Sequence, residues 1–392
     1  MIRTVLAFVI FLTSGVLGPL PAAADGGPLR VGIDGEYGLK SSTSAQAIER
    51  GVRIAVAEIN AAGGVLGGRT IEVVTRDNRS LPARGIDNLQ EFIADPAVIA
   101  VFAGRFSPVV FDEAPIAEAQ HMPLLAVWSS AEGITRTPPD GSYVFRLSLR
   151  DLNAMPAMIR HAVRLGWGRV GLLLPNTAWG RSNLKVAEDR IGEIRGASQV
   201  GVSWYNWGNR TMVDRYEELV KAGAQAIIFV ANDIEGEILV REMAALPPER
   251  RLPLICHWGI TGGEFVRVTA GALSKFDLSV IQTFSFFSAE PGRLARFMAA
   301  ARPFGITRIE DIESPVGTAH GYDMMHVLAR AVTLAGSADR AAIRDALERV
   351  RDYPGLIRDY PAPFSESSHE ALTEAEVFMA RFRDDGVIVP IR

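Results

Sequence analysis

The sequence predicts an α/β protein of two lobes, each built around a largely parallel sheet. Short runs rich in Val and Ile, typical of buried strands, alternate with longer stretches whose apolar residues recur three and four positions apart, typical of helices. This alternation occurs in two successive sets. The chain of 392 residues, 48% hydrophobic and 22% charged, is long enough for two cores. A repeated strand–helix order implies parallel sheets covered on both faces.

The first set of elements precedes residue 128. Strands are expected at 29–33, 71–75, 98–103 and 123–127, and helices at 45–62, 86–94 and 107–120. The helix at 45–62 has the clearest pattern, because Ile48, Val52 and Ile59 fall on one face and Gly63 ends it.

The second set follows. An extended segment is expected at 143–148, strands at 170–174, 200–205, 226–230, 253–256 and 278–284, and helices at 152–165, 181–194, 213–221, 315–335 and 340–350. In open α/β sheets, ligands sit beyond the carboxyl ends of the strands. Two facing lobes would place those ends around one cleft, which is a usual place for a small-molecule site.

The first residues are typical of a secretory signal peptide rather than of the fold. Arg3 is followed by the apolar run 6–17, which is too short to cross a bilayer core of about 30 Å, and then by three alanines before Asp25. We expect cleavage near Ala24, which makes residues 1–24 the signal peptide and places the mature chain in the periplasm.

Composition and motifs exclude several functions. The formal net charge of -4 gives no basic excess for nucleic acid. The single cysteine, Cys256, rules out an intramolecular disulfide and multi-cysteine metal sites. The chain has no G-x-S-x-G, H-E-x-x-H or P-loop motif, and its six histidines lack metal-ligand spacing. We therefore expect no catalytic residue, no metal and no cofactor.

The segment 51–77 carries a recognisable pattern, GVRIAVAEINAAGGVLGGRTIEVVTRD: a helix ending in Glu-Ile-Asn, a paired-glycine turn and a strand ending in Asp. Glycines that cradle phosphate would follow a strand and open a helix, whereas these follow a helix. The segment resembles a signature of the branched-chain amino-acid (Leu/Ile/Val) binding family of ABC importers. Further segments resemble that family in order along nearly the whole mature chain: 101–110, 122–135, 143–153, 176–184 and 319–332.

The resemblance implies a type I periplasmic binding fold, in which two Rossmann-like lobes joined by three crossings close on a small solute. Placing the crossings near 147–151, 282–286 and 353–361 gives lobe 1 as 25–148 plus 286–358, and lobe 2 as 149–285 plus 359–392. It also implies a monomeric substrate-binding protein, not an enzyme, that serves ABC permease subunits in the inner membrane. The alternative is a ligand-sensing receptor subunit of the same fold with a membrane signalling partner.

Three ligand-binding candidates surround the start of the helix at 107–120. Ser107 begins that helix after a buried strand, so its hydroxyl and the free N–H groups suit a carboxylate. It also matches the ligand serine of the family. Arg105 could pair with a carboxylate and Phe106 could line the pocket. A plain helix cap and a solvated charge are the alternatives for Ser107 and Arg105.

Other candidates follow strands of the first lobe. Trp128, Ser129 and Ser130 come after the strand at 123–127, where the family offers backbone groups and a hydroxyl to the head group of an amino acid. An ordinary turn with a helix cap is the alternative. Tyr37 follows the first strand and resembles an aromatic wall of the pocket; it could also be a rim or core aromatic.

In the second lobe, Trp179 replaces a family tyrosine and could stack on the ligand as a lid. The family often holds the ligand ammonium with an acid near 257, but this chain has His257 and Trp258 there. Asp233 and Glu264 are the acidic alternatives, and neither is needed if the ligand is an aromatic carboxylate held among tryptophans.

Overall fold

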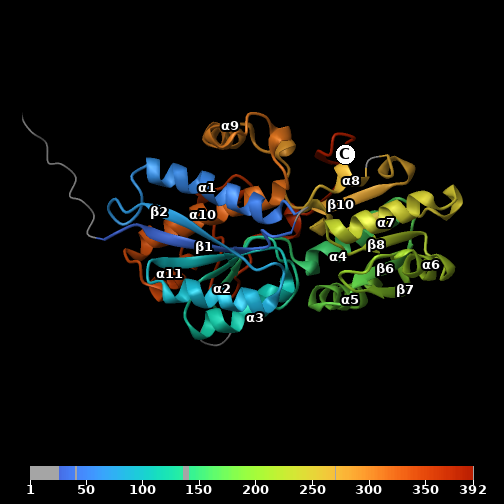
Figure 1. The fold of residues 1–392 in the computed structure, drawn as a ribbon, viewed down its shortest axis with the longest axis horizontal. Coiled ribbons are helices and arrows are strands. Elements are labelled where there is room, and N and C mark those ends of the chain that lie inside the picture. The colour runs from blue at the N-terminus through green and yellow to red at the C-terminus, as the bar shows by residue number, and fades with distance from the viewer. Residues whose placement is uncertain (1–25, 40–41, 136–140, 270, 392) are drawn as a thin grey trace, which may run out of the picture.

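The computed structural model describes residues 26–39, 42–135, 141–269 and 271–391. Figure 1 shows two lobes side by side, with the first strands and helices on the left and elements α4 to α8 on the right. The predicted signal peptide, residues 1–24, lies outside the described residues. Among the described helices, none combines the length and the apolar character needed to cross a membrane.

The first lobe is built on a five-stranded parallel sheet of order β2-β1-β3-β4-β5. Its strands are β1 (Leu29–Gly35), β2 (Ile71–Asp77), β3 (Val98–Ala103), β4 (Leu124–Ala126) and β5 (Val144–Arg146). Its helices are α1 (Ser44–Ala61), α2 (Pro82–Ala94), α3 (Ser107–Ala119), α10 (Pro315–Ala335) and α11 (Arg340–Leu347). The chain moves one way from β1 to β2 and the other way from β2 to β4. Right-handed crossovers therefore put α1 on one face and α2 with α3 on the other.

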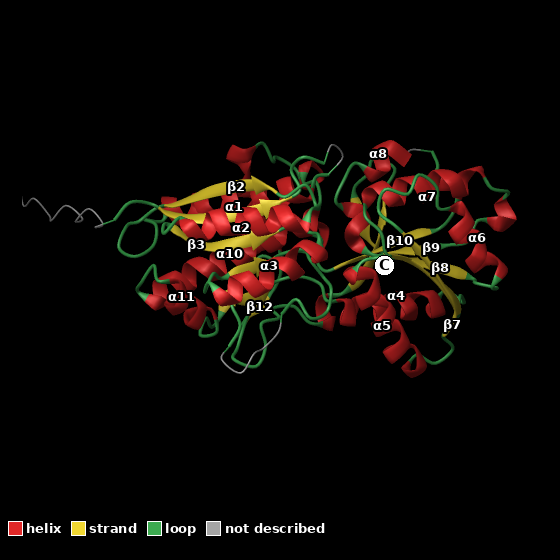
Figure 2. Cartoon of the chain, turned by 60° about the horizontal axis from the view of Figure 1, so that its bottom comes forward, coloured by secondary structure: helices red, strands yellow, loops and turns green. Residues whose placement is uncertain are grey.

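The second lobe has a seven-stranded sheet of order β14-β13-β10-β9-β8-β6-β7, seen at the right of Figure 2. Its strands are β6 (Arg169–Pro175), β7 (Ser198–Tyr205), β8 (Ala226–Phe229), β9 (Leu254–Cys256), β10 (Leu278–Gln282), β13 (Phe378–Phe382) and β14 (Ile388–Pro390). The helices are α4 (Asp151–Arg164), α5 (Ala178–Arg190), α6 (Val213–Lys221), α7 (Asp233–Ala245) and the short α8 (Phe265–Thr269). The two strands from the C-terminus, β13 and β14, are antiparallel to their neighbours.

The α/β class, the two parallel-dominated sheets and the order of the elements are as predicted. The elements not predicted include helices α8 and α9 (Pro291–Ala301), a small hairpin at residues 353–360, and the edge strands β13 and β14. Helix α9 nonetheless begins with a recognisable signal, because the Glu290 carboxylate accepts hydrogen bonds from the N–H groups of Gly292 and Arg293.

A small hairpin, β11 (Tyr353–Pro354) with β12 (Asp359–Tyr360), follows helix α11. The buried Asp323 of α10 holds it, by accepting hydrogen bonds from the hydroxyls of Tyr353 and Tyr360 and from the N–H groups of Leu356 and Ile357. Every oxygen of this carboxylate thus has partners.

The chain after the hairpin remains attached to the first sheet. Arg146 of β5 donates its N–H to the carbonyl of His369 at 2.8 Å, and Ala371 donates to the carbonyl of Arg146 at 2.9 Å. The Arg146 guanidinium also forms a two-pronged ion pair with Glu370. We propose that the third crossing follows residue 371, later than the boundary at 358/359 expected from the sequence; the other lobe boundaries remain predictions.

Candidate functional site

Functional side chains gather where the carboxyl ends of both sets of strands meet. Residues directly after β3 and β4 in the first lobe face residues directly after β6, β8 and β9 in the second. Backbone contacts join the lobes here: Thr43 donates its N–H to the carbonyl of Gly262 at 2.7 Å, and Ser42 forms an isolated bridge with Gly263. The lobes are therefore closed on each other.

Arg105 lies at the centre of this contact. Its guanidinium Nη2 is 2.7 Å from Oδ1 of Asp233 at the start of α7, and both side chains are at most 1% exposed. Nη1 reaches the carbonyl of Gly259 at 3.4 Å. A Cβ atom on Gly262 would lie 1.9 Å from Nη1, so only glycine leaves room for the arginine there. Arg105 of the first lobe is thus held by the second.

Glu36 is a site residue that the sequence analysis missed. It follows β1 directly, is completely buried, and its Oε1 lies 3.8 Å from Nε of Arg105. The same oxygen accepts hydrogen bonds from the hydroxyls of Ser42, at 3.3 Å, and Ser44. Its position directly after the first strand was the available signal, but the aromatic ring of the neighbouring Tyr37 was predicted to line the pocket there.

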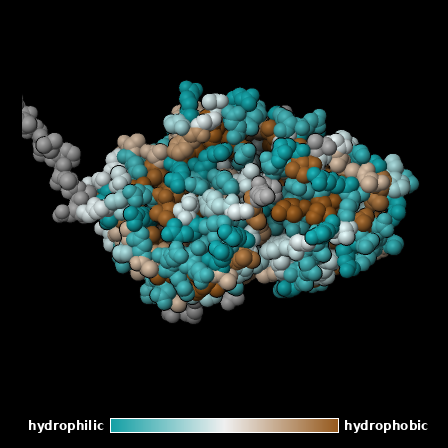
Figure 3. All heavy atoms as spheres, viewed as in Figure 1, coloured by the Kyte–Doolittle hydropathy of each residue, from teal (hydrophilic) through white to brown (hydrophobic). Residues whose placement is uncertain are grey.

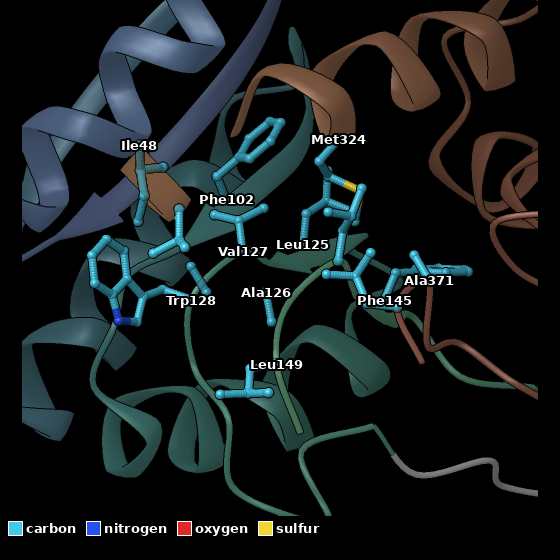
Figure 4. Close-up of a cluster of buried hydrophobic side chains, with 14 of the residues drawn as sticks. Ile48, Phe102, Leu125, Ala126, Val127, Trp128, Phe145, Leu149, Met324 and Ala371 are labelled. Carbon is cyan, nitrogen blue, oxygen red and sulfur yellow. The ribbon is translucent and has the colours of Figure 1, made fainter. Parts of the chain in front are cut away.

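Two tryptophans meet across the lobes. Trp128, after β4, and Trp258, after β9, have ring centroids 5.7 Å apart and are both buried. Figure 4 shows Trp128 at the edge of the first-lobe core, continuing from Ala126 and Val127. Gly317 of α10 makes room for it, since a Cβ there would lie 2.6 Å from the indole. Aromatic rings from both lobes therefore meet at this contact.

His320 of α10 supports this aromatic pair from behind. Its ring lies 5.6 Å from that of Trp258, with Nδ1 2.9 Å from the carbonyl of Val127 and Nε2 3.0 Å from the hydroxyl of Thr283. Burial lowers the pKa of His320 to about 4, so the ring stays neutral near pH 7. His320 thereby links the end of β4 to the segment that follows β10.

A buried polar cluster of the second lobe surrounds Asp151. Its carboxylate accepts hydrogen bonds from the indole N–H of Trp179 at 3.3 Å and from the hydroxyl of Ser182 at 2.6 Å, and lies 3.2 Å from Nε2 of His257. Nδ1 of His257 accepts the N–H of Trp258 at 3.0 Å, so Nε2 carries the proton that points at Asp151. Asp151 thereby orients both Trp179 and the turn bearing Trp258.

The predicted serines lie at the edge of the site, and two of their hydroxyls hold loops. Ser129 donates to the carbonyl of Gly104 at 2.6 Å, and Ser107 accepts the N–H of Ala131 at 3.4 Å. Ser130 accepts the N–H of Asp151 through its carbonyl at 2.9 Å, which ties the loop to the second lobe. Their contact with a ligand remains a proposal.

The three remaining candidates, Phe106, Tyr37 and Glu264, have separate surroundings. The ring of Phe106 stacks under the Arg105 guanidinium at 4.9 Å and meets Trp207 of the second lobe edge-on at 5.2 Å. Tyr37 is half-buried beside Gly35 and its hydroxyl faces Glu49 of α1 rather than the Arg105 cluster. Glu264 is 41% exposed and pairs with Arg267 on the outer side of its turn.

The chemistry of this site suits binding. Arg105 and Asp233 are buried and form an ion pair. Within the described part of the chain, no three His, Cys, Asp or Glu residues gather as a metal site. Burial raises the pKa of Glu235, which lies beside Asp233 in the first turn of α7, to about 7. The site therefore offers one guanidinium, several carboxyl groups and flat aromatic surface.

Comparison with known proteins gives consistent matches. The model of the periplasmic binding protein family matches residues 33–386. A Leu/Ile/Val-binding protein homolog 2 of Brucella abortus is 22% identical over 360 residues, covering 91% of this chain and 92% of the relative.

Solved structures agree in fold. A type 1 periplasmic binding protein of Bordetella pertussis superposes with a TM-score of 0.83 at 21% identity, covering 93% of this chain and all of the other. A solute-binding protein of an ABC transporter from R. palustris, solved with benzoate, gives 0.75 at 16% identity, covering 93% and 96%. The family model spans both lobes, and so the chain belongs to the periplasmic binding protein family, a family of solute-binding proteins and not of enzymes.

Proposed function

We propose that this chain is the periplasmic substrate-binding protein of an ABC importer, and that it binds an amino acid or a small carboxylate, aromatic or aliphatic, between its lobes. The observation that carries the proposal is Arg105, a first-lobe residue whose shortest ion pair is with Asp233 of the second lobe. A buried guanidinium suits two-pronged binding of a carboxylate. Trp128 and Trp258 beside it offer a flat apolar surface for the rest of the solute.

The names of similar proteins support the two solute classes. The curated relative is named for binding Leu, Ile and Val, and the structural neighbour from R. palustris holds benzoate. The ligand would touch Arg105, the Ser107 end of α3, the 128–130 loop and the tryptophans, whereas Tyr37 would contribute at the rim.

The mechanism follows from the contacts between the lobes. A solute enters when the lobes open at the three crossings, which separates Arg105 from Asp233 and lets water reach both charges. A solute that contacts both lobes stabilises the closed state and shifts the population toward it. The permease subunits of the inner membrane then accept the closed form of the monomeric protein, which is released into the periplasm by cleavage near Ala24.

A thermal-shift screen of residues 25–392 against amino acids and small carboxylates tests the proposal. A ligand that binds only the folded state adds about 2.7 kcal/mol at a hundredfold excess over its Kd. We expect at least one solute to raise the melting temperature, and Arg105→Lys, which keeps the charge but loses the planar fork, to weaken that rise. No rise with either class would overturn the proposed function.

A further inference from the structure

The carboxylate of Glu36 has one oxygen with two hydroxyl partners and one oxygen with none. Oε1 accepts from Ser42 and Ser44, whereas Oε2 has no hydrogen-bond partner among the described residues, although the side chain is 0% exposed. Buried polar groups are nearly always hydrogen-bonded, and leaving a charged one unpaired is costly. An orphaned, fully buried carboxylate oxygen therefore needs an explanation.

The neighbouring cation does not supply one. Nε of Arg105 is 3.8 Å from Oε1 of Glu36, whereas Nη2 is 2.7 Å from Oδ1 of Asp233, so the closer ion pair of the guanidinium is with the second lobe. Among the described residues no other Lys or Arg nitrogen lies within 4 Å of Glu36. One guanidinium thus serves two carboxylates, and the first-lobe carboxylate is the less well paired.

The position of Glu36 couples it to closure. The hydroxyl of Ser42, which binds Glu36, also reaches the carbonyl of Gly262 in the second lobe at 3.3 Å, so this turn covers the carboxylate when the lobes close. Opening the lobes would return Glu36 to water. Closing them without a partner costs desolvation of its charge, and a cationic group brought by the solute would offset that cost.

We propose that Glu36 recognises a cationic group of the solute, so that this site selects ammonium-bearing solutes over bare carboxylates. The inference rests on the proposed function and narrows it to one of its two solute classes. Neither acid considered from the sequence is as well suited to the ammonium: Asp233 is engaged by Arg105, and Glu264 is exposed and paired with Arg267. An ammonium group carries three N–H donors, enough for the free oxygen of Glu36 and further acceptors.

Two matched series of solutes test this by isothermal titration calorimetry. L-leucine, 4-methylpentanoate and 3-methylbutylamine share an aliphatic group and carry both charges, only the carboxylate, or only the ammonium. L-phenylalanine, 3-phenylpropanoate and 2-phenylethylamine do the same with a ring. We expect the tightest member of the better-binding series to contain the ammonium, with the carboxylate-only member at least 100-fold weaker.

Variants assign the effect to Glu36. Glu36→Gln should weaken ammonium-bearing solutes at least tenfold while leaving carboxylate-only binding unchanged or tighter, and Glu264→Gln, the matched loss of a carboxylate outside the contact, should stay within twofold of wild type. If Glu36→Gln does not fold, Ser44→Ala keeps the charge but removes a donor that orients it. It should then weaken only the ammonium-bearing solutes.

The outcomes distinguish a failure of the role of Glu36 from a failure of the proposed function. Equal binding of the carboxylate-only members, or a Glu36→Gln variant that binds the amino acid as well as wild type does, overturns the role of Glu36 and leaves the proposed function standing. Failure of both series and of all other small carboxylates and amino acids would overturn the proposed function and this inference with it.

Discussion

Asp323 beside the β11–β12 hairpin and Glu36 where the lobes meet are both completely buried carboxylates of the first lobe, but of the two only Asp323 is hydrogen-bonded through both oxygens. Asp323 accepts from two tyrosine hydroxyls and two backbone N–H groups, which fixes the β11–β12 hairpin. Glu36 leaves one oxygen without a partner where the lobes meet. The comparison teaches that a buried acid with four donors holds the fold, whereas a buried acid with a free oxygen where the lobes meet is available to a ligand, as proposed for Glu36.

The largest effect is expected from removing the satisfied acid. Asp323→Ala leaves four buried donors without their acceptor and should lower the free energy of unfolding by about 4 kcal/mol. Glu36→Ala, which removes only two hydroxyl contacts, should lower it by about 1 kcal/mol. Urea unfolding of both variants measures the difference, and equal losses would break the comparison.

Asp34 and Glu113 form a third group of buried acids in the first lobe, and their protonation makes stability depend on pH. Asp34 accepts from the amides of Asn78 and Asn88, both at 2.6 Å, and faces Glu113 across Gly85. Burial raises the pKa of Asp34 to about 6 and raises that of Glu113 well above its ordinary value. Among the described residues no Lys, Arg or His forms an ion pair with either acid, and burial makes the folded state hold these protons more tightly than the unfolded chain does.

The sign of the effect follows from this. Because the folded state binds more protons between the unfolded and folded pKa values, stability falls as the pH rises from about 4 through 6, by about 3 kcal/mol for Asp34. Glu113→Gln removes one of the two raised pKa values and should flatten the total pH dependence of stability, as measured by urea unfolding between pH 4.5 and 7.5. An unchanged slope would show that the pair does not share protons.

The smallest effect is expected at the glycine that accommodates Arg105. Gly262→Ala would place a methyl group on Nη1 and displace the guanidinium from Asp233, which should weaken the solute about tenfold, or 1.4 kcal/mol. Gly192→Ala, which adds a methyl group with no atom within 4 Å, is the control and should bind like wild type. Calorimetry on both checks this, and equal affinities would contradict the central place of Arg105.

The sequence predicted the fold better than the site. Periodicity located the strands and most helices, because burial on one face leaves a regular pattern; β13, β14 and α9 were missed because short edge strands and a lightly buried helix carry little of it. Arg105, Trp128, Trp179, Asp233, His257 and Trp258 were predicted because each follows a recognisable strand, and the structure brings these side chains together; their contact with a ligand remains a proposal.

Which side chains pair with each other could not be predicted from the sequence, because the pairs form only once the chain has folded and the two lobes close. The pairing of Arg105 with Asp233 joins residues 128 positions apart, and Asp151 organises Trp179 and His257 from a helix start that gave no functional signal. Glu36 was overlooked because an acid after a strand is ordinarily solvated, whereas the folded chain buries this one completely.

The rest of the molecule can be compared with the site around Arg105 as a place for a solute to bind. On the face in Figure 3 most exposed atoms belong to hydrophilic residues, and the apolar ones lie in separate patches on each lobe. A separate cavity of about 280 Å³ opens near Phe286, lined by both lobes and by Glu310, Glu313 and Asp385. This cavity is the alternative to the site around Arg105 as the place where a solute binds.

A crystal structure of residues 25–392 with the tightest solute from calorimetry tests the central claim most directly. The account predicts density between the lobes, in contact with Arg105 and with both Trp128 and Trp258, and with a nitrogen of the solute within hydrogen-bond distance of Glu36. Density in the cavity near Phe286 instead, with the Arg105 cluster unchanged, would contradict it.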